Sequence, residues 1–511
     1  MLRSGVEERT ASTVGKIMNL TLLVAALALS ACTPASPTAE PPTQTVIPGS
    51  TQAPSMPPAI IETGAPTPTE TAEPSPIATH LPTSTPVAPT ATPLPQIHAS
   101  CYPDASAPLE DLVVLKGPEH LFDPSCQVSG GVGQIAARWD IDRDGSPEST
   151  HLDPPPLALQ PGEYNPVVDF TDQAGQSLTV KLPRIVKVGE PKYPDWTLGV
   201  MEHLNNTFGV YPDAQSIEAA ANLMSDARIP AVRVDFEWAD IELHRGTYRW
   251  ERYDALVSIL VSAGVNVVPI LTYSPQWATD GNSKFSSPTS PDDFGAFVGA
   301  LARRYRDRID VYQIWQEANT SLYFDPPDPD RYSELLNIAY LNVKYYDPGA
   351  VVVMAGLAND ASAAYPGTVF IPPEDFLRAL YENEALFDVV ARHPFTHPLE
   401  TLDTLRQRMQ TIRQTMSQHG DNYSQLWVTE YTASTNLGHP GGLSEEEQAS
   451  WLSQSLRVLL NEHLADKVFW YNLRDTVVDS DPFFAYSGLV HHDLTPKPAW
   501  YSFCELVNRY P

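Results

Sequence analysis

The sequence predicts an α/β fold, in which a (β/α)8 TIM barrel follows a small N-terminal β-sandwich domain and a disordered Pro/Thr-rich linker. Three observations predict it. Over residues 191–511, apolar strands alternate with amphipathic helices eight times. Residues 98–190 contain short apolar runs separated by turn residues, which is typical of small sandwiches. Residues 32–97 are rich in proline and threonine and have too few large apolar residues to bury a core.

Residues 1–31 are predicted to be a lipoprotein signal peptide. Basic residues precede the apolar stretch "LTLLVAALALSAC", which is too short for a permanent membrane-spanning helix. The stretch closes on "LSAC", which resembles a bacterial lipobox, and the resemblance implies a lipid anchor on Cys32. The alternative is an ordinary secretory peptide with an incidental cysteine. In both cases we expect an exported protein, lipid-anchored at the bacterial cell surface or secreted.

Residues 32–97 are predicted to form an extended stalk. The last 65 of these positions include 17 prolines and 14 threonines and no lysine or arginine. A proline-rich chain extends by about 3.1 Å per residue, so the next domain would stand up to ~200 Å from the membrane.

The net charge of the whole chain is −30, which disfavours nucleic acid as a partner. Because the predicted stalk is long, we expect the protein to act on something outside the cell. We also expect it to be a monomer.

Residues 98–190 show strand patterns in "GQIAARWDID", "GEYNPVVDF" and "SLTVKLPRIVKV". Their order resembles that of a PKD-type, immunoglobulin-like domain. Cys101 and Cys126 flank one short segment of an exported chain, so we expect a disulfide between them.

An acidic turn in this domain has the spacing of a calcium loop. Asp140, Asp142 and Asp144 alternate directly before Gly145. An acidic turn in a sandwich that needs no ion is the alternative, and the sequence leaves both open.

The barrel prediction rests on eight strand candidates between residues 197 and 475. Apolar residues recur at helical spacing over 294–305 and 402–416, in the segments between strands. A doubly wound open sheet is the rival, but no glycine-rich phosphate loop follows the first strand. The strand candidates are "TLGVMEHL", "AVRVDFEW", "VNVVPILTYS", "VYQIWQEA", "VVVMAGLA", "DVVARHPF", "LWVTEYTA" and "KVFWYNLRD".

Two glutamates end strand candidates, and barrel enzymes place their chemistry where strands run into the following loops. Glu317 ends the fourth strand and Glu430 the seventh, each after an apolar run with a tryptophan. Two carboxyls that converge on one cleft can hold different pKa values, one as acid and one as nucleophile. This is the equipment for cleaving a glycosidic bond, whereas a single strand-end glutamate would be merely solvated or salt-bridged.

The motifs around both glutamates resemble clan A glycoside hydrolases, most of all family 39. Trp315-Gln316-Glu317-Ala318-Asn319 is similar to the family's W-N-E-P-N motif, and "TEY" around Glu430 is similar to its nucleophile motif. The resemblance covers nearly all of residues 196–509. It implies a retaining hydrolase of β-glycosidic bonds in an extracellular polysaccharide or oligosaccharide, with Glu317 as acid/base, Glu430 as nucleophile and no cofactor.

Two positions depart from the family pattern. Gln316 replaces the asparagine that binds the sugar 2-hydroxyl, and Phe395 replaces a tyrosine whose hydroxyl holds the nucleophile. Both departures favour the alternative function, a catalytically weak barrel that binds glycans at the cell surface.

Seven further side chains are candidates for substrate binding by their position near strand ends. Arg233 is expected to pair with Glu430, although a salt bridge elsewhere in the barrel is the alternative. For the tryptophans the alternative is core packing, and for the histidines a structural role. We expect no metal site, because Pro394 argues against the helix that His393 and His397 would need as a zinc pair. The candidates are Arg233, Gln316, His393, Trp277, Trp470, Trp238 and His203.

Overall fold

The computed structural model describes residues 94–102, 112–116, 121–205, 209–279, 283–360, 365–395, 401–476 and 483–511. The predicted signal peptide, Cys32 and almost all of the predicted stalk lie outside these residues. No helix in the described part of the chain combines the length and the apolar character needed to cross a membrane.

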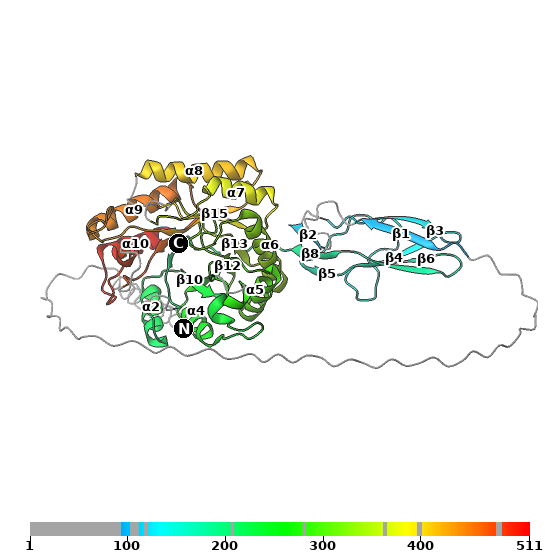
Figure 1. Cartoon of the computed structure of the whole chain (residues 1–511), viewed down its shortest axis with the longest axis horizontal. Helices are drawn as coiled ribbons and strands as arrows, with labels where there is room; N and C mark the ends of the chain where they lie inside the picture. The colour runs from blue at the N-terminus through cyan, green and yellow to red at the C-terminus, as the bar shows by residue number, and fades with distance from the viewer. Residues whose placement is uncertain are drawn as a thin grey trace, which may run out of the picture. The chain divides into compact units, whose positions relative to one another are not determined.

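In the described part of the N-terminal domain, eight short strands form three sheets around one apolar core (Figure 1). The sheets are β1–β3, β2–β8–β5 and β4–β6–β7. Proline residues divide two of the predicted runs into pairs of strands, at Pro166 and Pro183, because proline cannot donate a ladder hydrogen bond. The strands are β1 (Ile97–Tyr102), β2 (Leu112–Lys116), β3 (Ser125–Gly130), β4 (Ala136–Asp140), β5 (Gly162–Tyr164), β6 (Val167–Thr171), β7 (Ser177–Lys181) and β8 (Arg184–Val188).

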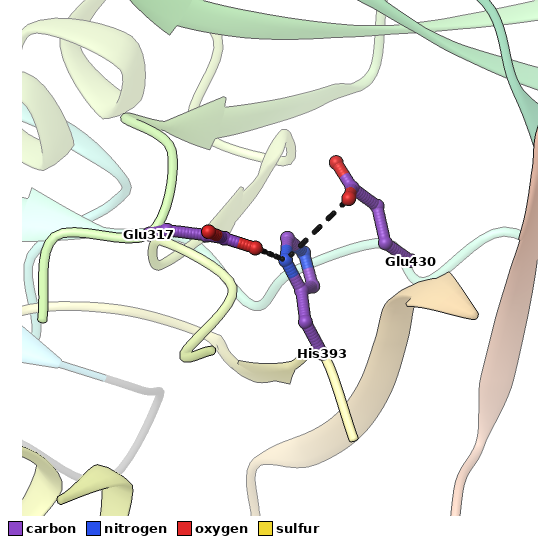
Figure 2. Close-up of side chains that lie close together, drawn as sticks. All are labelled: Glu317, His393 and Glu430. Carbon is purple, nitrogen blue, oxygen red and sulfur yellow. Dashed lines mark hydrogen bonds and ion pairs between the residues drawn. The ribbon is translucent and has the colours of Figure 1, made fainter. Parts of the chain in front are cut away.

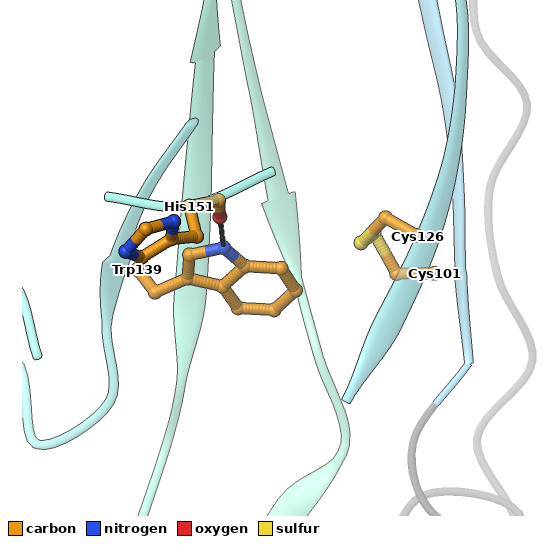
Figure 3. The surroundings of a disulfide bond; sticks show 4 residues. All are labelled: Cys101, Cys126, Trp139 and His151. Carbon is orange, nitrogen blue, oxygen red and sulfur yellow. Dashed lines mark hydrogen bonds between the residues drawn. A yellow bond between two sulfur atoms is a disulfide. The ribbon is translucent and has the colours of Figure 1, made fainter. Parts of the chain in front are cut away.

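The predicted disulfide is confirmed. Cys101 in β1 and Cys126 in β3 face each other in the antiparallel pair and are joined (Figure 3). Trp139 of β4 is fully buried in the core, and its indole N–H donates to the carbonyl oxygen of His151 at 2.8 Å. A covalent cross-link and one large buried ring thus stabilise a domain too small for an extensive core.

The C-terminal domain is a closed barrel of eight parallel strands, which confirms the predicted TIM barrel. Each of the eight predicted runs coincides with one of the strands, although the seventh strand begins one residue before its run, at Gln425. Helices surround the barrel (Figure 1). The strands are β9 (Leu198–Met201), β10 (Ala231–Glu237), β11 (Asn266–Thr272), β12 (Val311–Ile314), β13 (Val351–Val353), β14 (Val389–Arg392), β15 (Gln425–Tyr431) and β16 (Lys467–Tyr471).

The helices follow from amphipathic segments with defined starts. The apolar residues predicted at helical spacing lie on the buried faces of α5 and α8. Helix α9 begins at a capping box, in which the side chains of Ser444 and Glu447 each accept from the other's backbone N–H. The helices are α2 (Ala214–Asp226), α3 (Trp238–Ile241), α4 (Glu251–Ser262), α5 (Pro291–Tyr305), α6 (Pro329–Tyr346), α7 (Pro373–Glu382), α8 (Leu402–Gln418), α9 (Glu445–Asn461) and α10 (Pro498–Arg509).

Candidate active site

Glu317 and Glu430 lie at the carboxyl ends of their strands. Glu430 is the penultimate residue of β15, and Glu317 follows the end of β12 by three positions. Trp315 and Glu317 have φ angles of 68° and 38°, in the left-handed region that non-glycine residues rarely adopt. Such backbone strain is concentrated at functional sites, and here it fixes the direction in which Glu317 leaves the strand.

His393, which directly follows β14, stands between the two glutamates (Figure 2). Its Nδ1 lies 2.6 Å from Oε1 of Glu317 and 3.7 Å from Oε2 of Glu430. One oxygen of each carboxyl lies within 4.8 Å of the other. Gly356 makes room for the ring, because a Cβ at this position would lie 2.0 Å from Nε2 of His393.

The surroundings of Glu317 favour its protonated form. Its exposed fraction is 8 %, and burial together with the negative charge of Glu430 raises the pKa of its carboxyl well above the ordinary value. Burial and the charges of Arg233 and Arg392 hold the pKa of His393 well below its usual range. Both shifts favour the neutral forms of the two partners. In that state the Glu317 O–H donates to Nδ1 of His393, whose Nε2–H donates to Oγ1 of Thr429 at 2.9 Å.

Glu430 lies beside a permanent positive charge. Nη1 of Arg233 donates to its Oε1 at 2.6 Å, and Nε2 of Gln316 donates to the same oxygen at 2.8 Å. Arg233 is fully buried, so this attraction is screened little by water. The expected pairing of Arg233 with Glu430 is therefore present. Gln316 also accepts from Nη2 of Arg233, so its amide spans the arginine and the glutamate.

Gln313 in β12 is a site residue that the sequence reasoning missed. Its Oε1 accepts from Nε of Arg233, and its Nε2 donates to the carbonyl of Met354 and to Oγ1 of Thr429. It thereby orients the guanidinium that holds Glu430. A polar residue inside the apolar run "VYQIW" was the available signal.

A second buried network, also missed apart from His203, lies on neighbouring strands. Nδ1 of His203 is 2.6 Å from Asp235 and its Nε2 is 3.1 Å from the hydroxyl of Tyr471. Burial opposes protonation, but the charge and hydrogen bond of Asp235 raise the pKa of His203. Next along β10, Glu237 pairs with Lys284 at 2.7 Å. The alternation of Arg233, Asp235 and Glu237 along one strand was the signal that they share a face.

Trp238 and Trp470 are engaged in packing, which contradicts their expected role as sugar platforms and agrees with the alternative of core packing. Trp238 is fully buried, stacks on Phe297 and donates to Glu242. Trp470 is also fully buried and donates to the carbonyl of Ser487 at 3.2 Å. Neither ring has a face open to a ligand, because both lie in the packed core.

Trp277 is half-buried, and the Arg245 guanidinium covers its ring at 5.0 Å. Its indole N–H donates to the Glu242 carbonyl at 2.8 Å. Phe395, at the tyrosine position of the family pattern, lies beside His393 with ring centroids 6.4 Å apart. It supplies an apolar wall there and no hydroxyl.

Metal ions use donor sets like the one that Glu317, His393 and Glu430 form, with three ligand atoms within 4.8 Å of one another. Arg233 already places a positive charge next to Glu430, and the raised pKa of Glu317 favours the neutral acid on the other side. Both features oppose the binding of a cation here. His397 lies outside the described residues.

No protein-family model matches the chain, and no curated protein matches it in sequence. Among solved structures, a GH5_18 protein from Streptomyces cattleya in complex with GlcNAc is similar at a TM-score of 0.50 and 17% identity, over 63% of this chain and 81% of that one. A family 39 glycoside hydrolase from Bacteroides cellulosilyticus WH2 gives 0.46 and 19%, over 78% and 81%. A GH39 beta-xylosidase from Caulobacter crescentus gives 0.48 and 18%, over 62% and 72%. At 17% identity, the likeness to the GH5_18 protein is one of fold alone.

Proposed function

We propose that the barrel is a retaining glycoside hydrolase that cleaves β-glycosidic bonds of an extracellular polysaccharide or oligosaccharide. The observation that carries the proposal is a close but asymmetric carboxyl pair. The nearest oxygens of Glu317 and Glu430 are within 4.8 Å. Retaining enzymes hold their carboxyls about 5–5.5 Å apart, whereas inverting enzymes leave ~6.5–9.5 Å for a water molecule. Burial raises the pKa of Glu317, while Arg233 stabilises the Glu430 carboxylate.

In the first step, Glu430 attacks the anomeric carbon and the bond from that carbon to the departing oxygen breaks. Glu317 gives its proton to this oxygen, so the leaving group departs as a neutral alcohol. Oε1 of Glu430 is held by Arg233 and Gln316, which leaves Oε2 to form the glycosyl-enzyme bond. In the second step Glu317, now ionised, takes a proton from water, whose oxygen displaces Glu430 and frees the sugar.

Two variants tested on two substrates distinguish the roles of the glutamates. Glu430→Ala should abolish turnover of every substrate, because no nucleophile remains. Glu317→Ala should lose about 10²- to 10⁴-fold on natural glycosides, yet keep its first step on an activated aryl glycoside, whose leaving group needs no proton. Its glycosyl-enzyme should accumulate, and azide should restore turnover. Equal losses on both substrates would remove Glu317 as the acid.

The alternative is a catalytically weak barrel that binds glycans at the cell surface, which Gln316 and Phe395 keep open. A reducing-sugar assay of the wild-type protein across a polysaccharide panel separates the two functions. Binding without release of reducing ends on any member of the panel would favour the alternative.

We further propose that the protein is exported and anchored through a lipid on Cys32. The support is the "LSAC" tetrapeptide at the end of the apolar stretch. Cys32→Ser should move the protein from the membrane fraction to the soluble fraction while the folded barrel keeps its activity. Retention of the variant in the membrane fraction would rule out the lipid anchor.

A further inference from the structure

We propose that the loop after β4 of the N-terminal domain binds one Ca²⁺ ion. Four acidic side chains converge there: Asp140, Asp142, Asp144 and Glu148 each contribute a carboxylate oxygen to a group whose members all lie within 4.8 Å of one another. Oxygen atoms at this mutual distance match the coordination sphere of an ion whose ligands stand about 2.3–2.6 Å away.

A second, independent observation is an orphaned oxygen. Asp140 is only 7 % exposed, and its Oδ1 has no hydrogen-bond partner in the described part of the chain. A buried carboxylate oxygen without a donor is costly, because it has lost water and gained nothing in exchange. A cation held by this group supplies the missing partner.

The other three acids are already oriented by the backbone. Oδ1 of Asp142 accepts from the N–H of Asp144 at 3.0 Å, and Oδ1 of Asp144 accepts from that of Ser146 at 2.6 Å. Oε2 of Glu148 accepts from the N–H of Ile141 at 2.6 Å. One oxygen of each of these carboxylates accepts a hydrogen bond from the backbone of the loop. The other oxygen can therefore coordinate the ion.

The order of residues matches the oxygen-ligand calcium loop over its first nine positions, whereas position twelve, a bidentate glutamate in that loop, is His151 here. If Asp140 is position one, the acids fall on positions one, three, five and nine, and glycine falls on position six. Gly145 has a φ of 91°, in the region that glycine adopts without strain, and a Cβ there would meet nothing within 4 Å. The glycine is thus required by the sharp turn rather than by crowding.

Arg138 is the competing source of positive charge. Its Nη1 lies 3.9 Å from Oδ2 of Asp140 and from Oδ2 of Asp169, and its Nη2 donates to the Gly145 carbonyl. One guanidinium that is shared with Asp169 cannot balance four carboxylates. The donor set contains only oxygen, which suits Ca²⁺ rather than Zn²⁺, and Mg²⁺ prefers to keep most of its water.

Calorimetric titration of the chelator-treated full-length chain with CaCl₂ tests the proposal. We expect one ion per chain with a Kd of about 10⁻⁴–10⁻³ M, the range of extracellular modules. The double variant Asp142→Asn/Asp144→Asn keeps both Oδ1 acceptors and should bind at least ~100-fold more weakly. Asp153→Asn, in the same domain but outside the group, should bind as the wild type does. The double variant also shows that the ion is not held by Glu317, His393 and Glu430.

A second variant keeps the test decisive if the double variant folds poorly. Arg138→Gln removes the competing charge, so it should tighten Ca²⁺ binding. Scanning calorimetry should show that added Ca²⁺ raises the unfolding temperature of the wild-type domain and not that of the double variant. No uptake by the wild type at 10 mM Ca²⁺, equal binding by the double variant, or unchanged affinity in Arg138→Gln would each overturn the proposal.

Discussion

Two buried clusters at opposite ends of the same barrel each combine a basic side chain with carboxyl groups. One cluster is balanced in charge, and the other is not. At the amino-terminal ends of the strands, Lys344 of α6 lies 2.8 Å from Oδ2 of Asp388, just before β14. Asp388 also accepts from the N–H of Val352 and the hydroxyl of Tyr340, and Lys344 donates to the carbonyl of Ala350. One cation faces one anion, and these hydrogen bonds hold both side chains in place.

At the carboxyl ends of the strands, two carboxyls lie near the hydrogen-bonding guanidinium of Arg233, while Arg392 acts on Glu317 through its charge. Arg233 donates to Glu430 and gives no hydrogen bond to Glu317, which instead bonds to the neutral His393. Burial is similar at both ends, so burial alone does not decide the outcome. The balance of charge decides it: the matched pair stabilises the fold, and the unmatched carboxyl keeps a proton that it can give away.

The largest effect should come from removing the charge at the reactive end. Arg233→Met leaves Glu430 buried without its cation, which should cost about 3–5 kcal/mol of stability and reduce kcat by ~10²- to 10³-fold. Arg233→Lys keeps the charge but loses the planar guanidinium. Its stability and kcat should therefore lie between those of the wild type and of Arg233→Met. The measurements are denaturant unfolding and kcat on an aryl glycoside. Full activity in Arg233→Met would contradict the role given to this pair.

Removing the matching cation at the other end should affect stability alone. Lys344→Met strands Asp388 and should cost about 3–5 kcal/mol in denaturant unfolding, with kcat per folded molecule unchanged. The double variant Lys344→Met/Asp388→Asn removes both charges and should recover most of this loss. A large fall in kcat with little change in stability would mean that the two ends are coupled.

A smaller effect is expected from Gln313, which touches Glu430 only through Arg233. Gln313→Met leaves Nε of Arg233 without an acceptor and should lower kcat about tenfold, with a loss of ~1–3 kcal/mol in stability. Gln313→Glu restores the acceptor and should recover kcat more than stability. If both variants lose stability and keep kcat, Gln313 only supports packing.

The mildest change to this end of the barrel is a change of pH alone. Because burial raises the pKa of Glu317, the acid is protonated below this raised pKa, and kcat/KM for a natural glycoside should fall tenfold per pH unit above it. With an activated aryl glycoside the alkaline fall should be weaker, since the first step no longer needs the proton. Identical pH profiles for both substrates would assign the alkaline limb to another group.

The sequence by itself determined the strands and helices of the barrel and the positions of the candidate catalytic glutamates along them. Eight apolar runs predicted the eight strands, because a strand that is buried on both faces is a nearly continuous run of apolar residues. Glu317 and Glu430 stood out because each interrupts an apolar run where a strand ends. The pairing of Cys101 with Cys126 followed from their number and setting.

The tertiary structure decided which side of each strand faces the site. Strands of a parallel barrel are apolar on both faces, so composition does not distinguish inward from outward residues. Trp470 was chosen from the sequence, yet its neighbour Tyr471 reaches His203, and Trp470 packs in the core. The raised pKa of Glu317 was equally beyond the sequence, because it depends on burial and on the charges of groups from β10, β14 and β15, which only the closed barrel brings together.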